Sequence, residues 1–196
     1  MTNVWDKTKI ASLLGRAFAP QLARQRAAGE EPDANIDVLI TFDSIGVSSH
    51  PNHISLYHGA RAFISALSAD PQWPSPVDLY TLTSVSVARK YSNFLDAIPT
   101  LFSWQPPKPP KKAKKEEDDS DDEDEDEDNN YHPTALVFLS ELGAEGGWAT
   151  AWNAMTTAHK SQMVWFRYGW IALSRYMVLN DLRLETVEGD ADEIKV

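Results

Sequence analysis

The sequence predicts an α/β fold in which helices flank a mostly parallel β-sheet. Three segments support this prediction: a helical pattern in residues 8–28, a short apolar run in residues 36–42, and a second helical pattern in residues 54–67. A helix followed by a buried strand and another helix is typical of an α/β unit, because parallel strands are joined by helical crossovers. The chain has 196 residues, which is enough for one domain of ordinary size.

The first helical pattern is interrupted once. Apolar residues recur every three or four positions from residue 8, and Pro20 is expected to break or restart the helix. The polar residues 29–34 then predict a loop. The β-branched, mostly apolar run 36–42 fits a strand that is buried in a parallel sheet.

A glycine- and serine-rich loop, residues 43–53, follows this strand. In open α/β sheets, ligands bind beyond the carboxyl ends of the strands, so this loop is a candidate site. Residues 54–67 predict a helix and the proline-rich residues 70–76 a turn. Alternating apolar and hydroxyl residues at 77–87 predict a second strand, and a short helix is expected at 89–97.

Residues 105–130 differ in composition from the rest of the chain. Prolines and lysines come first, and residues 116–128 then hold twelve of the 29 acidic groups, so the net charge of -11 belongs largely to this tract. Such a segment has few apolar side chains to bury, and we expect a disordered insertion in a surface loop. One domain would then comprise residues 1–104 and 131–184, with a flexible tail at 185–196.

The remaining segments complete the α/β pattern. Residues 136–139 predict a short strand, residues 152–173 one long helix rich in Trp, Met and Ala, and residues 175–184 a final strand or turn. The chain has no cysteine, which excludes disulfides and cysteine-based sites. No apolar run reaches the roughly 18 residues of a membrane span, so we expect none in this chain, and we expect no nucleic-acid partner.

Two histidines in the loop, His50 and His53, are the main candidates for chemistry. They lie three residues apart after a buried strand, so both can face one cavity, and imidazole is a common zinc ligand that titrates near neutral pH. One could bind a metal while the other acts as an acid or an electrostatic stabiliser. The alternative is that both are surface residues that cap the helix predicted to begin near Ile54.

Other histidines and arginines are weaker candidates. His159 lies in the long predicted helix, where a hydrogen-bonded packing role is the simpler interpretation. Arg167 and Arg175 lie among aromatic residues and could either extend from an apolar face to solvent or contact a phosphate of substrate or lipid. No role is assigned to His58 or His132.

Two segments resemble one family closely. Residues 38–57 contain Thr-Phe-Asp, Gly-Val-Ser and then His50, Asn52 and His53, and residues 154–177 contain His159, Ser-Gln, Trp-Phe-Arg and Ser-Arg-Tyr-Met. In order and spacing both resemble the N-acetylglucosaminyl-phosphatidylinositol de-N-acetylases, which are LmbE-like zinc deacetylases. The resemblance implies a Rossmann-like, LmbE-like fold that is incomplete at its N-terminus in this chain.

The resemblance also implies a reaction. The family removes acetate from N-acetylglucosaminyl-phosphatidylinositol in glycosylphosphatidylinositol (GPI) anchor biosynthesis, on the cytoplasmic face of the endoplasmic reticulum membrane. The expected cofactor is Zn²⁺ or another divalent metal, and the partner is a glycolipid at a membrane surface. His53 would be a metal ligand and His50 the catalytic residue that stabilises the oxyanion or protonates the leaving amine. The residues expected to contact substrate or support the site are Asp43, Asn52, His159 and Arg167.

The sequence also departs from the family. The family's His-Pro-Asp-Asp-Glu segment, which supplies further metal ligands and a general base, does not occur in these 196 residues. We therefore expect this chain by itself to bind zinc weakly and to be catalytically inactive. Two alternatives remain open: a non-catalytic paralogue that binds a partner, and a protein-interaction module built around the acidic tract.

Overall fold

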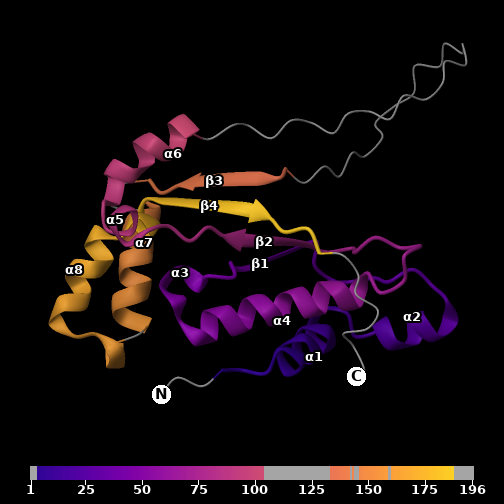
Figure 1. Cartoon of the computed structure of the whole chain (residues 1–196). Helices are drawn as coiled ribbons and strands as arrows, with labels where there is room; N and C mark the ends of the chain where they lie inside the picture. Colours follow the sequence, from indigo (N-terminus) through magenta and orange to yellow (C-terminus); the bar gives the residue numbers. More distant parts are fainter. Residues whose placement is uncertain (1–3, 104–132, 142, 144–145, 159, 188–196) are drawn as a thin grey trace, which may run out of the picture.

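The computed structural model describes residues 4–103, 133–141, 143, 146–158 and 160–187. The predicted insertion at 105–130 lies outside the described residues, as do His132 and His159. Figure 1 shows the described elements as one sheet with a helical layer beneath it and a cluster of short helices at one end.

The sheet has four strands, β1 Val38–Phe42, β2 Asp78–Leu82, β3 Ala135–Leu139 and β4 Leu179–Leu184, in the order β1-β2-β4-β3 (Figure 1). β1 and β2 are parallel, whereas β4 is antiparallel to both of its neighbours. The α/β class is thus confirmed, but the sheet is mixed and not mostly parallel. The last residue of β3, Leu139, lies opposite Leu179, the first residue of β4, so β4 runs back along β3.

The helical layer forms as the sequence predicts. Asp6 caps α1 (Lys7–Phe18) by accepting from the Thr8 amide at 2.8 Å, and a new helix, α2 (Leu22–Ala28), begins after Pro20. The long helix α4 (Pro51–Leu67) packs on β1 and β2, and α1 packs on α4. The core between α4 and the sheet is apolar and includes Phe63, Ile64, Leu67, Val77 and Leu79.

Strand β1 forms one edge of the sheet among the described residues. Its face carrying Val38 and Ile40 is open, with 57% of the Ile40 side chain exposed. An apolar hollow beside this strand is lined by residues of α1, α4 and β1. Among the described helices, none combines the length and the apolar character needed to cross a bilayer.

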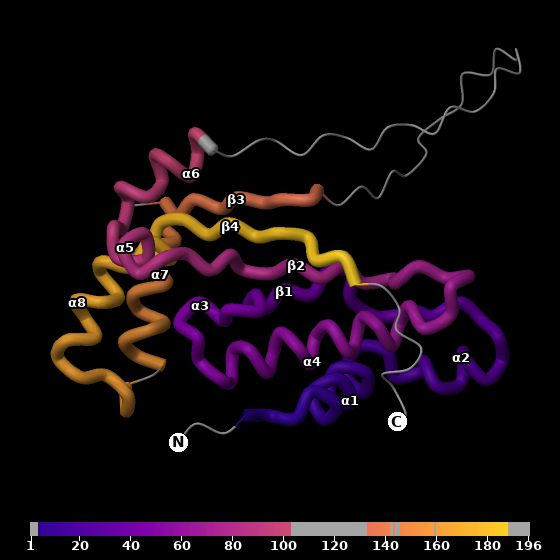
Figure 2. Tube along the Cα trace, viewed as in Figure 1, coloured from indigo at the N-terminus to yellow at the C-terminus, as the bar shows by residue number. Residues whose placement is uncertain are grey.

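The single helix predicted for residues 152–173 is wrong. The segment forms α7 (Gly147–Asn153), a π-turn at Ala154–Ala158, a 3₁₀ turn at Lys160–Gln162 and then α8 (Trp165–Leu173). The hydroxyls of Thr156 and Thr157 donate to carbonyls four residues earlier, which competes with regular helix formation. Figure 2 shows the chain descending α7, turning, and returning along α8.

The segment after β2 is also divided. It forms α5 (Val87–Lys90), a 3₁₀ turn at Asn93–Asp96 and α6 (Ala97–Ser103), while a 3₁₀ turn at Arg175–Met177 precedes β4. The first residue of the predicted tail, Glu185, is packed on the domain: its carboxylate accepts from Tyr57 Oη at 2.8 Å and pairs with Arg61. Burial and this hydrogen bond raise the pKa of Tyr57.

A buried ion cluster joins the short helices to β4. The side chain of Arg175 is 0% exposed, with its Nε 2.7 Å from Asp96 Oδ2 and its Nη2 3.2 Å from Asp181 Oδ1. The Nε–H does not point along the line to Asp96, so this contact is an ion pair and not a hydrogen bond. Arg89 donates to the same Asp96 at 2.7 Å. Arg175 therefore neither extends to solvent nor lies open to a phosphate, and both alternatives from the sequence are wrong.

Replacing the arginine of this cluster should unfold the protein more easily. We expect Arg175→Met to lower the free energy of unfolding by about 3–5 kcal/mol, because Asp181 loses its buried partner and Asp96 loses one of two. Urea denaturation measures this. Arg16→Met is the matched control, since Arg16 is exposed on α1 and should change stability by about 0.5 kcal/mol or less. Equal stability of the two variants would contradict the role given to the cluster.

Candidate functional site

The loop that follows β1 has an unusual backbone. It includes the one-turn helix α3 (Gly46–Ser49), and Gly46, Val47 and Ser49 have φ values of 67°, 61° and 54°. A β-branched residue such as Val47 rarely adopts positive φ, so the loop stores strain that its surroundings must offset. A Cβ on Gly46 would lie 3.0 Å from the Cβ of His53, so glycine also allows the histidine to approach closely.

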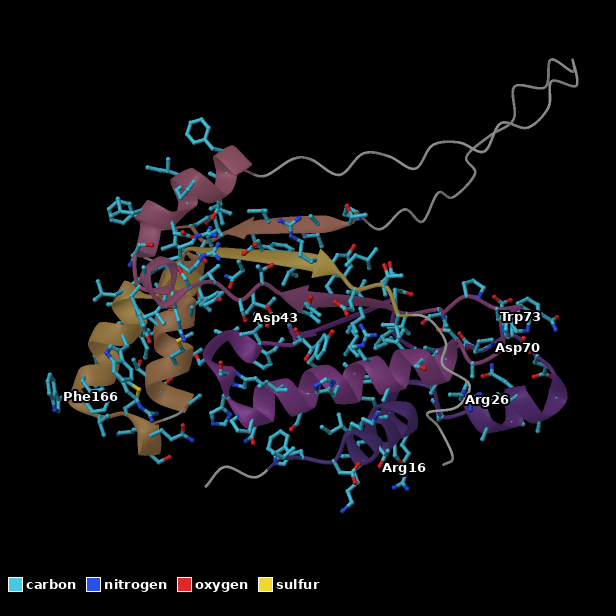
Figure 3. The ribbon with its side chains drawn as sticks, viewed as in Figure 1. Arg16, Arg26, Asp43, Asp70, Trp73 and Phe166 are labelled. Carbon is cyan, nitrogen blue, oxygen red and sulfur yellow. The ribbon has the colours of Figure 1, made fainter. Side chains whose placement is uncertain are left out.

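Asp43 holds this loop in place. Its carboxylate accepts from the backbone amides of Ile45 at 3.1 Å and Gly46 at 2.9 Å, and from the amide and hydroxyl of Ser84, both at 2.6 Å. Ser84 follows β2, so one carboxylate ties together the carboxyl ends of the two parallel strands. The Ser84 hydroxyl in turn accepts from the Val47 amide at 2.7 Å. The strained backbone is therefore held by charge-assisted hydrogen bonds. Figure 3 labels Asp43 at this end of the sheet.

His53 lies in the first turn of α4 and is fixed on two sides. Its ring stacks on Phe42, the last residue of β1, with centroids 3.9 Å apart and planes 7° apart. Its Nδ1 lies 3.0 Å from the carbonyl oxygen of Gly46. A carbonyl oxygen only accepts, so the proton of the neutral ring is on Nδ1 and the lone pair of Nε2 is free. A metal-binding histidine is oriented in this way.

In His50 the ring nitrogens have the opposite hydrogen-bonding roles from those in His53. His50 is the N-cap of α4, and its Nδ1 accepts from the backbone amide of Asn52 at 3.3 Å. The proton of the neutral ring is therefore on Nε2, which can donate. The two imidazole centroids are 5.1 Å apart. The alternative that the histidines cap a helix thus holds for His50, although the helix begins at Pro51 rather than near Ile54.

Of the other predicted site residues, Asn52 lies beside the histidine pair, and Arg167 does not. Asn52 lies between the two histidines, and its Oδ1 is buried with no hydrogen-bond partner among the described residues. Arg167 is exposed on α8, and no described hydrogen bond of its side chain links it to the loop. His58 is exposed one turn beyond the pair, against the ring of Tyr57. His159 lies outside the described residues.

Two residues that hold the loop were given no role by the sequence analysis. One is Ser84, and the other is Lys90 of α5, whose ammonium donates to the hydroxyl of Ser48 in the loop. Partial burial lowers the pKa of Lys90. A signal for Ser84 was present, because it follows the second strand as Asp43 follows the first, and the ends of adjacent parallel strands meet at one edge.

The described residues match a metal site only in part. No group of three His, Asp or Glu side chains that could hold a metal occurs in the part of the chain that the structure describes. The carboxylate of Asp43 is engaged by four donors, which leaves His53 Nε2 as a prepared ligand. A catalytic zinc ion takes three protein ligands. The described residues therefore supply one ligand and do not complete a zinc site.

These features define a class of protein. It is an α/β protein that carries a pair of oppositely oriented imidazoles at the carboxyl edge of two parallel strands, on a loop held by a carboxylate. We compared the chain with protein-family models, solved structures and curated proteins. No protein-family model matches the chain, and no solved structure matches it.

Curated relatives do match the chain. It is 44% identical over 194 residues to the N-acetylglucosaminyl-phosphatidylinositol de-N-acetylase of Arthroderma benhamiae, a match that covers 95% of this chain and 57% of the relative. It is 38% identical over 186 residues to a probable enzyme of that name from Schizosaccharomyces pombe and 26% identical over 194 residues to that of Saccharomyces cerevisiae; each match covers 95% of this chain and 56% of the relative.

Over 95% of its length the chain is homologous to N-acetylglucosaminyl-phosphatidylinositol de-N-acetylases, as the two sequence segments predicted. It spans about half the length of the curated relatives that it matches.

Removing the carboxylate of Asp43 should release the loop. We expect Asp43→Ala to lower the free energy of unfolding by about 2 kcal/mol, because partly buried donors lose a charged acceptor. Hydrogen exchange should accelerate at the amides of Gly46 and Ser84. The control is Ser44→Ala, because Ser44 is exposed. Unchanged exchange at both amides in Asp43→Ala would show that the carboxylate does not hold the loop.

The tautomers of the two histidines can be observed directly. Nitrogen-15 NMR of the imidazoles at a pH where both rings are neutral should show His53 protonated at Nδ1 and His50 protonated at Nε2, because their partners are a carbonyl oxygen and an amide N–H. His58 provides an exposed reference ring. The same tautomer for His50 and His53 would contradict the arrangement described here.

Proposed function

We propose that this chain carries part of the active site of a metal-dependent amide hydrolase that removes acetate from N-acetylglucosaminyl-phosphatidylinositol. One observation carries the proposal: the rings of His53 and His50, whose centroids are 5.1 Å apart, present an available lone pair and an available N–H, respectively. The names of the relatives support the substrate. The setting that follows is GPI anchor synthesis on the cytoplasmic face of the endoplasmic reticulum membrane.

His53 would bind the metal through Nε2. The hydrogen bond to the Gly46 carbonyl fixes the orientation and the tautomer of the ring, as partners of metal-bound histidines commonly do. Stacking on Phe42 limits rotation of the ring. The metal, when bound, would supply a polarised water and a positive charge. The remaining ligands would come from residues other than those described.

His50 would act on the substrate itself. Amide hydrolysis places negative charge on the carbonyl oxygen and requires a proton for the leaving amine. The Nε2–H of His50 can donate to either atom. His50 stands at the N-terminus of the 17-residue helix α4, where the helix dipole favours developing negative charge.

The neighbours of the pair have supporting roles in this proposal. Asp43 positions the loop and does not touch substrate, because its oxygens are engaged by backbone and Ser84 donors. The buried oxygen of Asn52, which lacks a described partner, is an acceptor available for an N–H group of a ligand. A paralogue that binds without catalysis is the alternative, and the following experiment separates the two.

Substitution of each histidine in the protein as it occurs in its native source should divide their roles. We expect His53→Ala and His50→Ala each to reduce acetate release from N-acetylglucosaminyl-phosphatidylinositol by about 10² to 10⁴-fold. Only His53→Ala should also weaken metal binding, measured by zinc content after dialysis. His58→Ala is the control and should leave both unchanged.

Two results would overturn the proposal. Acetate release that persists in His53→Ala and His50→Ala would remove the pair from the reaction. Absence of acetate release from the unaltered protein, together with specific binding of the glycolipid, would establish the binding-only alternative.

A further inference from the structure

Helix α8 exposes aromatic and apolar side chains around its surface. Trp165 is 85% exposed, and the helix has no buried residue. We define the α8 surface by its exposed apolar and aromatic side chains, which are Val164, Trp165, Phe166, Tyr168, Trp170 and Leu173. A soluble fold rarely leaves so many large apolar residues of one helix open, and such a patch marks an interaction site.

The charge of this region differs from that of the whole protein. The chain has a net charge of -11, yet residues 147–177 contain no Asp or Glu. The exposed charged residues described in this segment are Lys160 and Arg167, both positive. Arg175 is neutralised within the buried cluster. The α8 surface is therefore apolar, aromatic and basic. It complements a partner that has an apolar interior covered by an anionic outer layer.

The α8 surface lies at the same end of the molecule as the histidine pair. The ring of Trp170 contacts Tyr91 at a centroid distance of 6.4 Å, and the Asn93 side chain donates to the Ala172 carbonyl. Tyr91 adjoins Lys90, which hydrogen-bonds to the loop that carries His50. Figure 3 shows Phe166 on the outer side of α8 and Trp73 at the opposite end of the molecule.

We propose that the α8 surface docks on an anionic lipid bilayer and places the histidine pair at the membrane interface. Trp and Tyr rings prefer the headgroup region, where their apolar faces and polar N–H or O–H groups are both accommodated. Arginine and lysine pair with lipid phosphates. Both exposed charges of this segment, Lys160 and Arg167, are positive, which complements the negative surface of an anionic bilayer.

The length of α8 determines how the helix can lie relative to the bilayer. With 9 residues at 1.5 Å each, α8 is about 14 Å long, against about 30 Å for a bilayer core. It therefore lies in the interface and does not cross it. The proposal rests on the proposed function only for the identity of the glycolipid that would be reached there; the lipid contact itself stands on the exposed residues.

The test is binding of the full 196-residue chain to vesicles by flotation, using phosphatidylcholine alone and phosphatidylcholine with phosphatidylserine. We expect the double variant Trp165→Ala/Trp170→Ala to reduce partitioning by about tenfold or more. Trp73→Ala is the matched control at the far end and should bind as the unaltered chain. Arg167→Glu should reduce binding to the phosphatidylserine vesicles by about tenfold and change binding to neutral vesicles little.

A second measurement guards against loss of fold. Far-ultraviolet circular dichroism and the urea midpoint of the double variant should stay close to those of the unaltered chain, since Trp165 and Trp170 are exposed. Brominated lipids should quench tryptophan fluorescence of the unaltered chain and of Trp73→Ala, and quench the double variant less.

The outcomes separate this proposal from the proposed function. His53→Ala should retain vesicle binding, so loss of acetate release with intact binding concerns the histidines alone. Failure of the unaltered chain to bind either vesicle, or equal binding by the double variant, would overturn the docking proposal. Self-association of the unaltered chain in light scattering that the double variant abolishes, without vesicle binding, would instead assign the α8 surface to a second copy.

Discussion

The carboxylate of Asp43 is the contact on which the candidate site depends. It joins the ends of β1 and β2 through Ser84 and binds the amide of Gly46, whose carbonyl oxygen in turn holds His53. One acidic side chain thus fixes the position of an imidazole at the carboxyl ends of two parallel strands. The positive φ values of Val47 and Ser49 are tolerable because these hydrogen bonds offset the strain.

The first half of the fold could be predicted from the sequence because its signals are local. Pro20 separates two helices, the β-branched run forms β1, and the apolar face of residues 54–67 forms most of α4. The second half was harder, because the pattern of residues 152–173 is helical in composition while threonine hydroxyls and an extended Val164 interrupt it. The direction of β4 follows from where α8 ends, and local pattern does not encode it.

The same contrast applies to the site. The spacing of His50 and His53 showed that they could face one cavity, but their opposite tautomers follow from a backbone carbonyl and a backbone amide that only the fold brings into place. Arg175 was misjudged for a related reason. Its aromatic sequence neighbours indicated a surface position, whereas its ion-pair partners Asp96 and Asp181 come from other elements and bury it completely. Long-range charge pairing of this kind has no sequence period.

The direct test of the account is the position of a metal relative to the two imidazoles. Anomalous diffraction at the zinc absorption edge, from crystals of the protein purified from its native source, would locate it. We expect zinc bound to Nε2 of His53, with His50 nearby but not coordinated. Zinc bound by both imidazoles, or zinc bound elsewhere with His53 free, would contradict the division of roles between the two histidines.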